Sequence, residues 1–198
     1  MTSTITITFG DQGENHVGME KIGQLADNGF DYDDLYKAKN IFDQENIATE
    51  LYHLGEEAYI LIARQAANHL AQPYTLKDLF NEQTSLPWDT KAKMYGRVVN
   101  KKARYNLCYA DYEQEPDYES GRGRVINFDS VPLLNQLKNS LPLYLGDKAE
   151  NLMAEGNYYY DINKCGIGYH GDAEIRKVIA LRLGASMPLY YQWCAEPP

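Results

Sequence analysis

His170 and Asp172 are the two residues whose types and spacing suggest chemistry most directly. Side chains alternate between the two faces of a strand, so residues two positions apart on a strand point to the same side. Both residues are metal ligands, and two histidines with one carboxylate form the facial triad of non-haem Fe(II) oxygenases. No histidine follows Asp172, and His16, His53 and His69 all precede the pair. The sequence therefore predicts two ligands of a metal site, without a second histidine where the triad needs one.

Two other interpretations of the pair stay open. His170 and Asp172 are also consistent with a metal-free contact between an imidazole and a carboxylate, or with surface residues of a turn around Gly171. An alternating apolar run over residues 177–184 follows and predicts a buried strand. This run contains Arg182, whose guanidinium is suited to bind a carboxylate through two parallel hydrogen bonds. A solvated sheet edge is the simpler role for the neighbouring Arg176, whereas the position of Arg182 inside the apolar run favours a role in anion binding.

A basic cluster lies near the middle of the chain and alternates with tyrosines. It contains Arg97, Lys101, Lys102 and Arg104, with Tyr105 directly after it. Cationic and aromatic side chains together are typical of surfaces that hold single-stranded nucleic acid. A charged hairpin on an acidic protein is the alternative, and the acidic residues between 111 and 119 oppose phosphate binding.

The composition limits the function classes. The chain has 198 residues and a formal net charge of −9, which disfavours a non-specific DNA-binding protein. Cys108, Cys165 and Cys194 have no paired spacing and predict free thiols in a reducing compartment. The N-terminus lacks the pattern of a signal peptide, and no apolar run is long enough to span a bilayer. We therefore expect an intracellular, cytoplasmic protein without membrane contact.

Periodicity divides the chain into two parts, an N-terminal α/β extension over residues 1–72 and a core over residues 73–198. In the first part we expect strands and helices in the order strand 4–9, helix 19–26, helix 31–45, strand 49–54 and strand 57–64. The run at 58–63 is apolar enough for a central strand. In the second part we expect helices at 75–83 and 131–140, an extension of helix at 148–155, and strands toward the end.

The second part resembles the AlkB-like 2-oxoglutarate/Fe(II)-dependent dioxygenases over roughly residues 87–198. The likeness rests on segments in the order of the family, which are residues 101–111 (KKARYNLCYAD), the helix at 131–140, residues 157–164 (NYYYDINK), His170-Gly171-Asp172, the strand at 178–183, and residues 188–193 (PLYYQW). The resemblance implies an α+β protein with a double-stranded β-helix core, a cupin-like jelly roll that is incomplete here because the chain ends before the later core strands.

The resemblance also implies roles for individual residues. His170 and Asp172 would bind Fe(II), and Asn163 and Arg182 would hold 2-oxoglutarate. The substrate would lie on Arg97, Lys101, Lys102, Arg104 and Tyr105. Similar proteins of this kind occur in large DNA viruses, so a viral origin is expected.

Two functions are consistent with this sequence. The first is a dioxygenase that demethylates or hydroxylates a nucleobase or a protein. The second is a non-catalytic scaffold that binds nucleic acid or a protein partner and has a degenerate metal site. Because an incomplete β-helix exposes a sheet edge, a second copy or a partner chain is expected to cover that edge.

Overall fold

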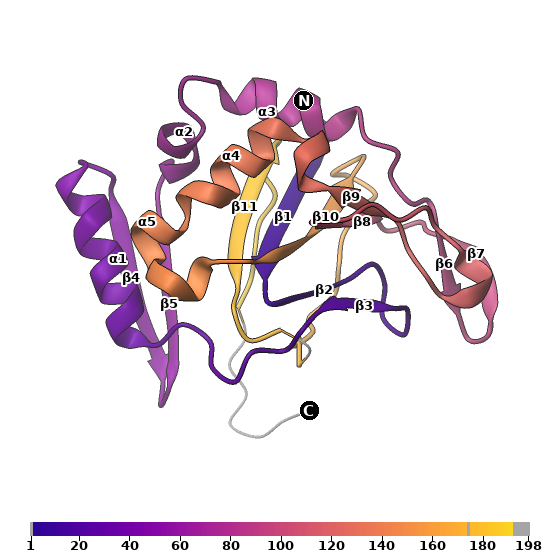
Figure 1. Cartoon of the computed structure of the whole chain (residues 1–198), viewed down its shortest axis with the longest axis horizontal. Coiled ribbons are helices and arrows are strands. Elements are labelled where there is room, and N and C mark those ends of the chain that lie inside the picture. The colour runs from indigo at the N-terminus through magenta and orange to yellow at the C-terminus, as the bar shows by residue number, and fades with distance from the viewer. Residues whose placement is uncertain (1, 174, 192–198) are drawn as a thin grey trace.

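A five-stranded sheet forms the centre of the computed structural model, which describes residues 2–173 and 175–191 (Figure 1). The order of its strands is β11-β1-β10-β8-β9. Their bounds are β1 Thr4–Gly10, β8 Tyr105–Ala110, β9 Val125–Asn127, β10 Met153–Tyr159 and β11 Ile179–Gly184. All neighbours are antiparallel except β8 and β9. In the described residues β11 and β9 are the edges of this sheet, which does not close into a barrel.

Helices cover one face of the sheet (Figure 1). Ile5, Ile7 and Phe9 of β1 point to this face and are fully buried in the main hydrophobic cluster, with Leu134 and Leu137 of a covering helix. The helices are α2 Ala66–Leu70, α3 Leu76–Thr84, α4 Pro132–Ser140 and α5 Pro142–Leu145, and the short 3-10 helices are η1 Tyr118–Ser120, η2 Phe128–Ser130 and η3 Gly146–Ala149. The opposite face carries the polar residues of the same strands, because successive side chains alternate.

Three two-stranded ribbons extend from this centre. They are β2 Gln12–Glu14 with β3 Lys21–Gly23, β4 Thr49–Gly55 with β5 Ala58–Ala63, and β6 Lys91–Met94 with β7 Arg97–Asn100. The β2–β3 ribbon covers part of the polar face, where Ile22 packs against Cys108 and Val125. The β4–β5 ribbon packs on helix α1 (Tyr32–Gln44) at one side of the molecule (Figure 1).

The structure confirms an α+β protein and several of the expected elements. The strand at 4–9, the helices at 31–45, 75–83 and 131–140, and the strands at 49–54, 57–64 and 178–183 are all present within a few residues. Capping boxes fix two helix starts, because Asp31 pairs with Asp34 and Thr75 with Asp78.

Other expectations were wrong. Residues 19–26 form strand β3 and an irregular segment instead of a helix, and residues 148–155 end a 3-10 helix and begin β10. Strand β5 is not central, since its described pairing is with β4 alone. Strand β1 belongs to the N-terminal extension by sequence, yet it lies between β10 and β11. The first 72 residues therefore supply part of the central sheet as well as a lateral layer.

Candidate functional site

The structure places His170 and Asp172 in the segment between β10 and β11, which has no regular secondary structure. The two side chains converge, with 3.7 Å between His170 Nε2 and Asp172 Oδ1, and they are 47% and 54% exposed. The Nδ1 atom of His170 lies 2.8 Å from the carbonyl oxygen of Gly168. The expectation that this pair lies on a strand was therefore wrong.

A facial triad for iron needs three protein ligands. Among residues 2–173 and 175–191, no three side chains of His, Cys, Asp or Glu lie close enough to hold a metal ion together. The described residues thus do not fit the Fe(II) centre implied by the resemblance. Metal binding by His170 and Asp172 stays a prediction.

The two residues expected to hold 2-oxoglutarate lie in different settings. Asn163 is exposed in the turn after β10, where its amide donates a hydrogen bond to Asp161 Oδ1. Arg182 lies on β11, and its Nη1 donates to the carbonyl oxygen of Met187 at 3.3 Å. The hydrogen bonds and ion pairs of the described residues do not connect the two, and their cofactor role stays a prediction. Gln192, Trp193 and Cys194 lie outside the described residues.

A row of polar side chains crosses the polar face, from the buried Asn106 and Asn157 to the exposed Arg182. Asn106 of β8 is paired with Asn157 of β10, Asn157 with Thr6 of β1, and Thr6 with Arg182 of β11. Because the four residues are in register, they point to the same face and follow one another at the strand spacing of about 4.8 Å. This row is a polar floor across four strands.

Arg104, one of the residues expected to bind substrate, is anchored at the β8 end of this floor. Its Nε donates a hydrogen bond of 2.6 Å to Asn157 Oδ1, which also accepts one of 2.6 Å from Asn106 Nδ2. Asn106 and Asn157 are only 4% and 8% exposed. Within the described part of the chain, the two terminal nitrogens of Arg104 make no hydrogen bond. Two buried amides therefore hold a guanidinium by its inner nitrogen and leave its outer edge for an anion.

Lys101 approaches the same region through a second polar network. Its Nζ donates to Asn15 Oδ1 at 2.8 Å, and Asn15 Nδ2 donates to Asp89 Oδ2 at 2.8 Å. Asp89 is 1% exposed and also accepts hydrogen bonds from the Tyr118 hydroxyl and from the backbone N–H of Arg124. Burial lowers the pKa of Lys101 to about 8, although the charge of Asp89 opposes this shift.

Glu155 lies beside Asn157 on the same face, because the two residues are two positions apart on β10. Its carboxylate accepts hydrogen bonds of 3.3 Å from Asn157 Nδ2 and from the backbone N–H of Glu14. Burial raises the pKa of Glu155 and outweighs the hydrogen bonds from Glu14 and Asn157, which favour the charged form. Buried polar groups with shifted pKa values mark candidate functional sites.

A row of aromatic rings lies at the same end of the sheet, on its helical face. Tyr105 stacks on Tyr160 with 4.6 Å between ring centroids and meets the edge of Tyr158, its cross-strand neighbour, at 6.4 Å. Trp88 continues the row at 5.4 Å from Tyr158. All four are half-buried. The Tyr160 hydroxyl donates to the carbonyl oxygen of Lys102, which joins this row to the basic segment.

The expected substrate-binding residues are thus partly gathered. Lys101, Lys102, Arg104 and Tyr105 lie together at the start of β8. Arg97 is at the far end of β7, beside the turn at Gly96, so a four-residue strand of roughly 13 Å separates it from Lys101. Cys108 and Cys165 are free and buried, and burial raises the pKa of Cys108. Such burial disfavours the thiolate, which is the reactive form of cysteine.

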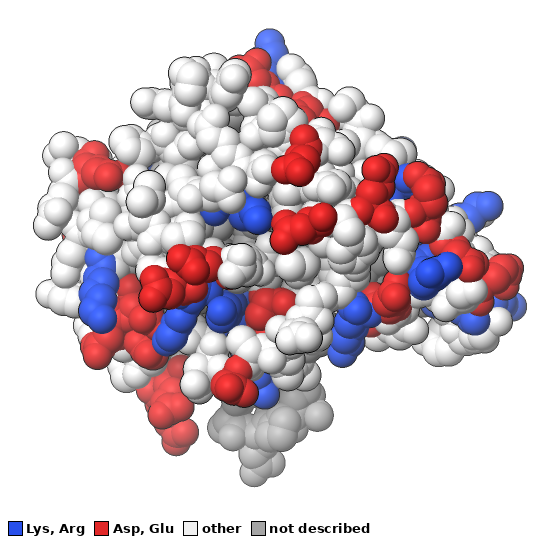
Figure 2. Space-filling model, viewed as in Figure 1, with Lys and Arg blue, Asp and Glu red and all other residues white. Residues whose placement is uncertain are grey.

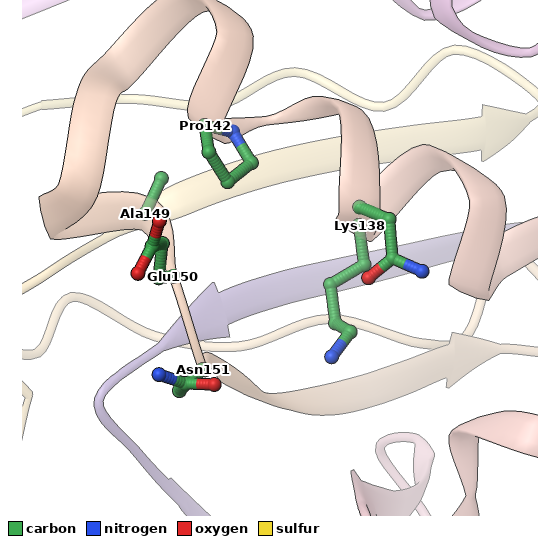
Figure 3. Close-up of a pocket in the computed structure, with 6 residues that line it drawn as sticks. Lys138, Pro142, Ala149, Glu150 and Asn151 are labelled. Carbon is green, nitrogen blue, oxygen red and sulfur yellow. The ribbon is translucent and has the colours of Figure 1, made fainter.

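Two hollows elsewhere on the surface are lined by side chains that are less suited to bind an anion or to catalyse a reaction. One of about 180 Å³ is lined by Lys138, Asn139, Pro142, Ala149, Glu150 and Asn151 at the corner between α4 and β10 (Figure 3). Another of about 440 Å³ includes Asp11, Asp147 and Glu150, and this acidic lining opposes anions. The carboxylate of Asp11 is occupied by the backbone N–H groups of Ala26, Arg176 and Lys177. These hydrogen bonds outweigh burial and lower its pKa.

Charge on the helical face is mixed. Figure 2 shows Lys and Arg interspersed with Asp and Glu around a largely uncharged area over the helices. No helix among the described residues has the length and apolar character needed to cross a membrane. Because its charges are mixed, the helical face is a weaker candidate for a binding site than the polar floor and its basic end.

One curated protein gives a clear match. Uncharacterized protein R156 of Acanthamoeba polyphaga mimivirus is 49% identical over 202 aligned residues, which cover 96% of this chain and 78% of the viral protein. The chain belongs to the family of this viral protein. No family model and no solved structure matches it. This relationship assigns no activity to the chain.

Several residues of the candidate site were not predicted. Asn157 and Glu155 alternate along β10 with the buried Ala154 and Gly156, and this period-two pattern was the available signal. Asn15 and Asp89 gave no local signal, because they meet across 74 residues of sequence. Their burial depends on the fold and is not visible from the neighbouring residues.

Proposed function

We propose that this protein binds a single strand of nucleic acid at the basic end of its central sheet, and that the irregular segment with His170 and Asp172 is a non-catalytic scaffold. The observation that carries the proposal is Arg104, which Asn157 and Asn106 hold in place with its terminal nitrogens without a partner among the described residues. A guanidinium with its fork free matches the oxygens of a phosphate group.

Two neighbouring features support a nucleic-acid strand over a small anion. Lys101 and Lys102 adjoin Arg104 and supply further cations for a chain of phosphates. The half-buried rings of Tyr105 and Tyr160 belong to the helical face but reach the basic segment through the hydrogen bond from Tyr160 to Lys102, and aromatic rings stack with bases whatever their sequence. A net charge of −9 restricts such binding to this site and makes it weak at physiological salt.

Fluorescence anisotropy with a labelled single-stranded oligonucleotide tests the proposal. The native protein should bind at low ionic strength, with an affinity that falls as salt rises. R104A should weaken binding and reduce the salt slope by about one. R97A removes the same charge from the far end of the β6–β7 ribbon and is the matched control. Equal effects of R104A and R97A would mean that general charge, and not the anchored arginine, determines binding.

The dioxygenase is the second proposal, together with the double-stranded β-helix core that the resemblance implies. The approach of His170 to Asp172 supports it, since two ligand atoms lie 3.7 Å apart. It requires a third ligand beyond those that the described residues bring together. Calorimetry with Mn(II), with and without 2-oxoglutarate, tests whether His170 contributes to a metal site.

A further inference from the structure

Three charged side chains come together above the polar floor. Glu155 and Arg104 both contact Asn157, through its Nδ2 and Oδ1 atoms. Lys101 donates to Asn15, and the backbone N–H of the adjacent Glu14 donates to Glu155, so the ammonium and the carboxylate are held by neighbouring residues of one segment. The group thus combines one carboxylate, one guanidinium and one ammonium, and two of the three are tied to a single buried amide. We call Lys101, Arg104 and Glu155 the charged triangle.

The environment of the charged triangle shifts the pKa values of an acid and a base toward neutral pH. Burial raises the pKa of Glu155, and burial lowers the pKa of Lys101 to about 8. Proton transfer is most effective when the pKa values of the groups lie near the working pH. A carboxylate and an ammonium whose pKa values are shifted toward each other in this way fit the roles of general base and general acid.

We propose that the charged triangle cleaves single-stranded RNA, with Glu155 as general base, Lys101 as general acid and Arg104 as the phosphate-binding cation. This activity rests on the proposed binding of a nucleic-acid strand and goes one step beyond it. Asn157 and Asn15 are positioning residues, because each is hydrogen-bonded to members of the triangle.

The reaction needs only what the triangle and the substrate supply. Glu155 takes the proton of a ribose 2′-hydroxyl, and that oxygen forms a bond to the adjacent phosphorus. The bond between phosphorus and the 5′-oxygen of the next nucleotide breaks, and Lys101 gives its proton to that oxygen. The products are a 2′,3′-cyclic phosphate and a 5′-hydroxyl end. Arg104 stabilises the negative charge that develops on the phosphate oxygens.

The nucleophile identifies the substrate class. Only RNA has the 2′-hydroxyl, so the same site should bind DNA without cutting it. The floor row fits a strand in extent, because its four strands reach over roughly 14 Å from Asn106 to Arg182. Phosphates beyond the cleaved one would lie toward Thr6 and Arg182 along this row.

The experiment uses the full-length protein in EDTA with three labelled strands of one sequence, made of RNA, DNA and 2′-O-methyl RNA. We expect cleavage of the RNA alone, with a cyclic phosphate end identified by mass spectrometry, and binding of all three by anisotropy. E155Q keeps the shape of the side chain and should slow cleavage by roughly 100-fold, the usual contribution of a general base. E150Q changes an exposed glutamate outside the triangle and is the matched control.

K101R gives a second measurement that does not depend on Glu155. It keeps a positive charge but cannot release a proton near neutrality, so cleavage should fall while the 2′-O-methyl strand still binds. Binding of that strand also shows that each variant is folded.

The outcomes separate the two proposals. If the native protein binds the 2′-O-methyl strand and leaves the RNA intact, the cleavage proposal is refuted and strand binding stands. Cleavage that E155Q leaves unchanged would come from another nuclease and would also refute it. If none of the three strands binds, the proposed function itself fails.

Discussion

The charged triangle and the His170–Asp172 pair both gather ligand-type side chains, but they are built differently. Glu155 belongs to the central strand β10, and Asn157 and Asn106, which are nearly fully buried, hold Arg104. His170 and Asp172 lie on an irregular segment, and about half of each side chain is exposed. The first group has buried side chains that hold its geometry, whereas His170 is supported by a contact to the nearby carbonyl oxygen of Gly168.

This difference shows what a motif in the sequence can and cannot establish. A functional group must be held in position by supporting side chains before it can bind or react with precision. The spacing of His170 and Asp172 identified residues of a type that can bind a metal. The charged triangle has, in addition, the buried amides of Asn106 and Asn157, which hold Arg104 in place. Function should therefore be more sensitive to the residues beneath the triangle than to the residues of the motif.

Replacement of the buried Asp89 should have the largest effect on stability. D89A leaves Asn15, the Tyr118 hydroxyl and the backbone N–H of Arg124 without their acceptor. We expect the free energy of unfolding to fall by about 3 kcal/mol or more, as measured by urea denaturation. D172A removes the same group from the exposed segment and should change it by less than about 0.5 kcal/mol. Similar values for the two variants would remove the structural contrast between the regions.

Substitutions of Asn157 and Asn163 test whether the side chains that support Arg104 matter more than exposed residues of the same type. N157A removes the acceptor for Arg104 Nε and Asn106 Nδ2, and we expect a loss of about 2 kcal/mol in unfolding free energy. It should also weaken oligonucleotide binding to the level of R104A, although Asn157 is not proposed to contact phosphate. N163A, in an exposed turn, should alter neither quantity. Native affinity in N157A would show that Arg104 does not need its support.

Lys101 gives the site a dependence on pH. Burial lowers its pKa to about 8, so the ammonium loses its proton as the pH rises from 7 to 9. Strand affinity should fall by roughly fivefold over this range, since one ion contact contributes up to about 1 kcal/mol. K101R should bind equally at both values. A native affinity that does not change between pH 7 and 9 would exclude Lys101 as a phosphate contact.

The same pKa has the opposite effect on stability. Between about pH 8 and 10.5 the unfolded chain keeps a proton on Lys101 that the native protein has lost. Because the unfolded state then binds more protons, this group makes the unfolding free energy rise with pH in that window. Binding and stability should therefore change in opposite directions, and the comparison with K101R isolates the contribution of this lysine.

Local signals were enough to predict much of the secondary structure. The alternation of Thr with Ile and Phe predicted β1, the acidic first turn with Asp31 and Asp34 favoured the start of one helix, and the spacing of Thr75 with Asp78 indicated the start of another. These features depend on contacts within a few residues. The same is true of β11, because its alternating apolar residues are a local signal that does not depend on the strands with which it pairs.

The errors arose where distant contacts decide the structure. Residues 19–26 have helical periodicity, yet Gly23 adopts a φ of +80°, and a Cβ there would lie 2.3 Å from the carbonyl oxygen of Asp11. That close approach belongs to the β2–β3 ribbon. The apolar run of β5 suggested a central strand, but Leu61 and Ala63 pack against the cluster around α1 and leave the strand half-buried. The floor row likewise exists only after β1 has paired with β10 and β11.

The smallest expected effect concerns His170. H170A should leave both stability and strand affinity unchanged within error, because the side chain is 47% exposed and its Nδ1 contact is to the nearby carbonyl oxygen of Gly168. Its only expected consequence is in calorimetry with Mn(II), where the native protein should show weak binding at most, since two ligands hold a metal less firmly than three. Binding that is tight, strengthened by 2-oxoglutarate and abolished by H170A would reverse the comparison. It would make the irregular segment, with a third ligand from outside the described residues, the catalytic part of the molecule.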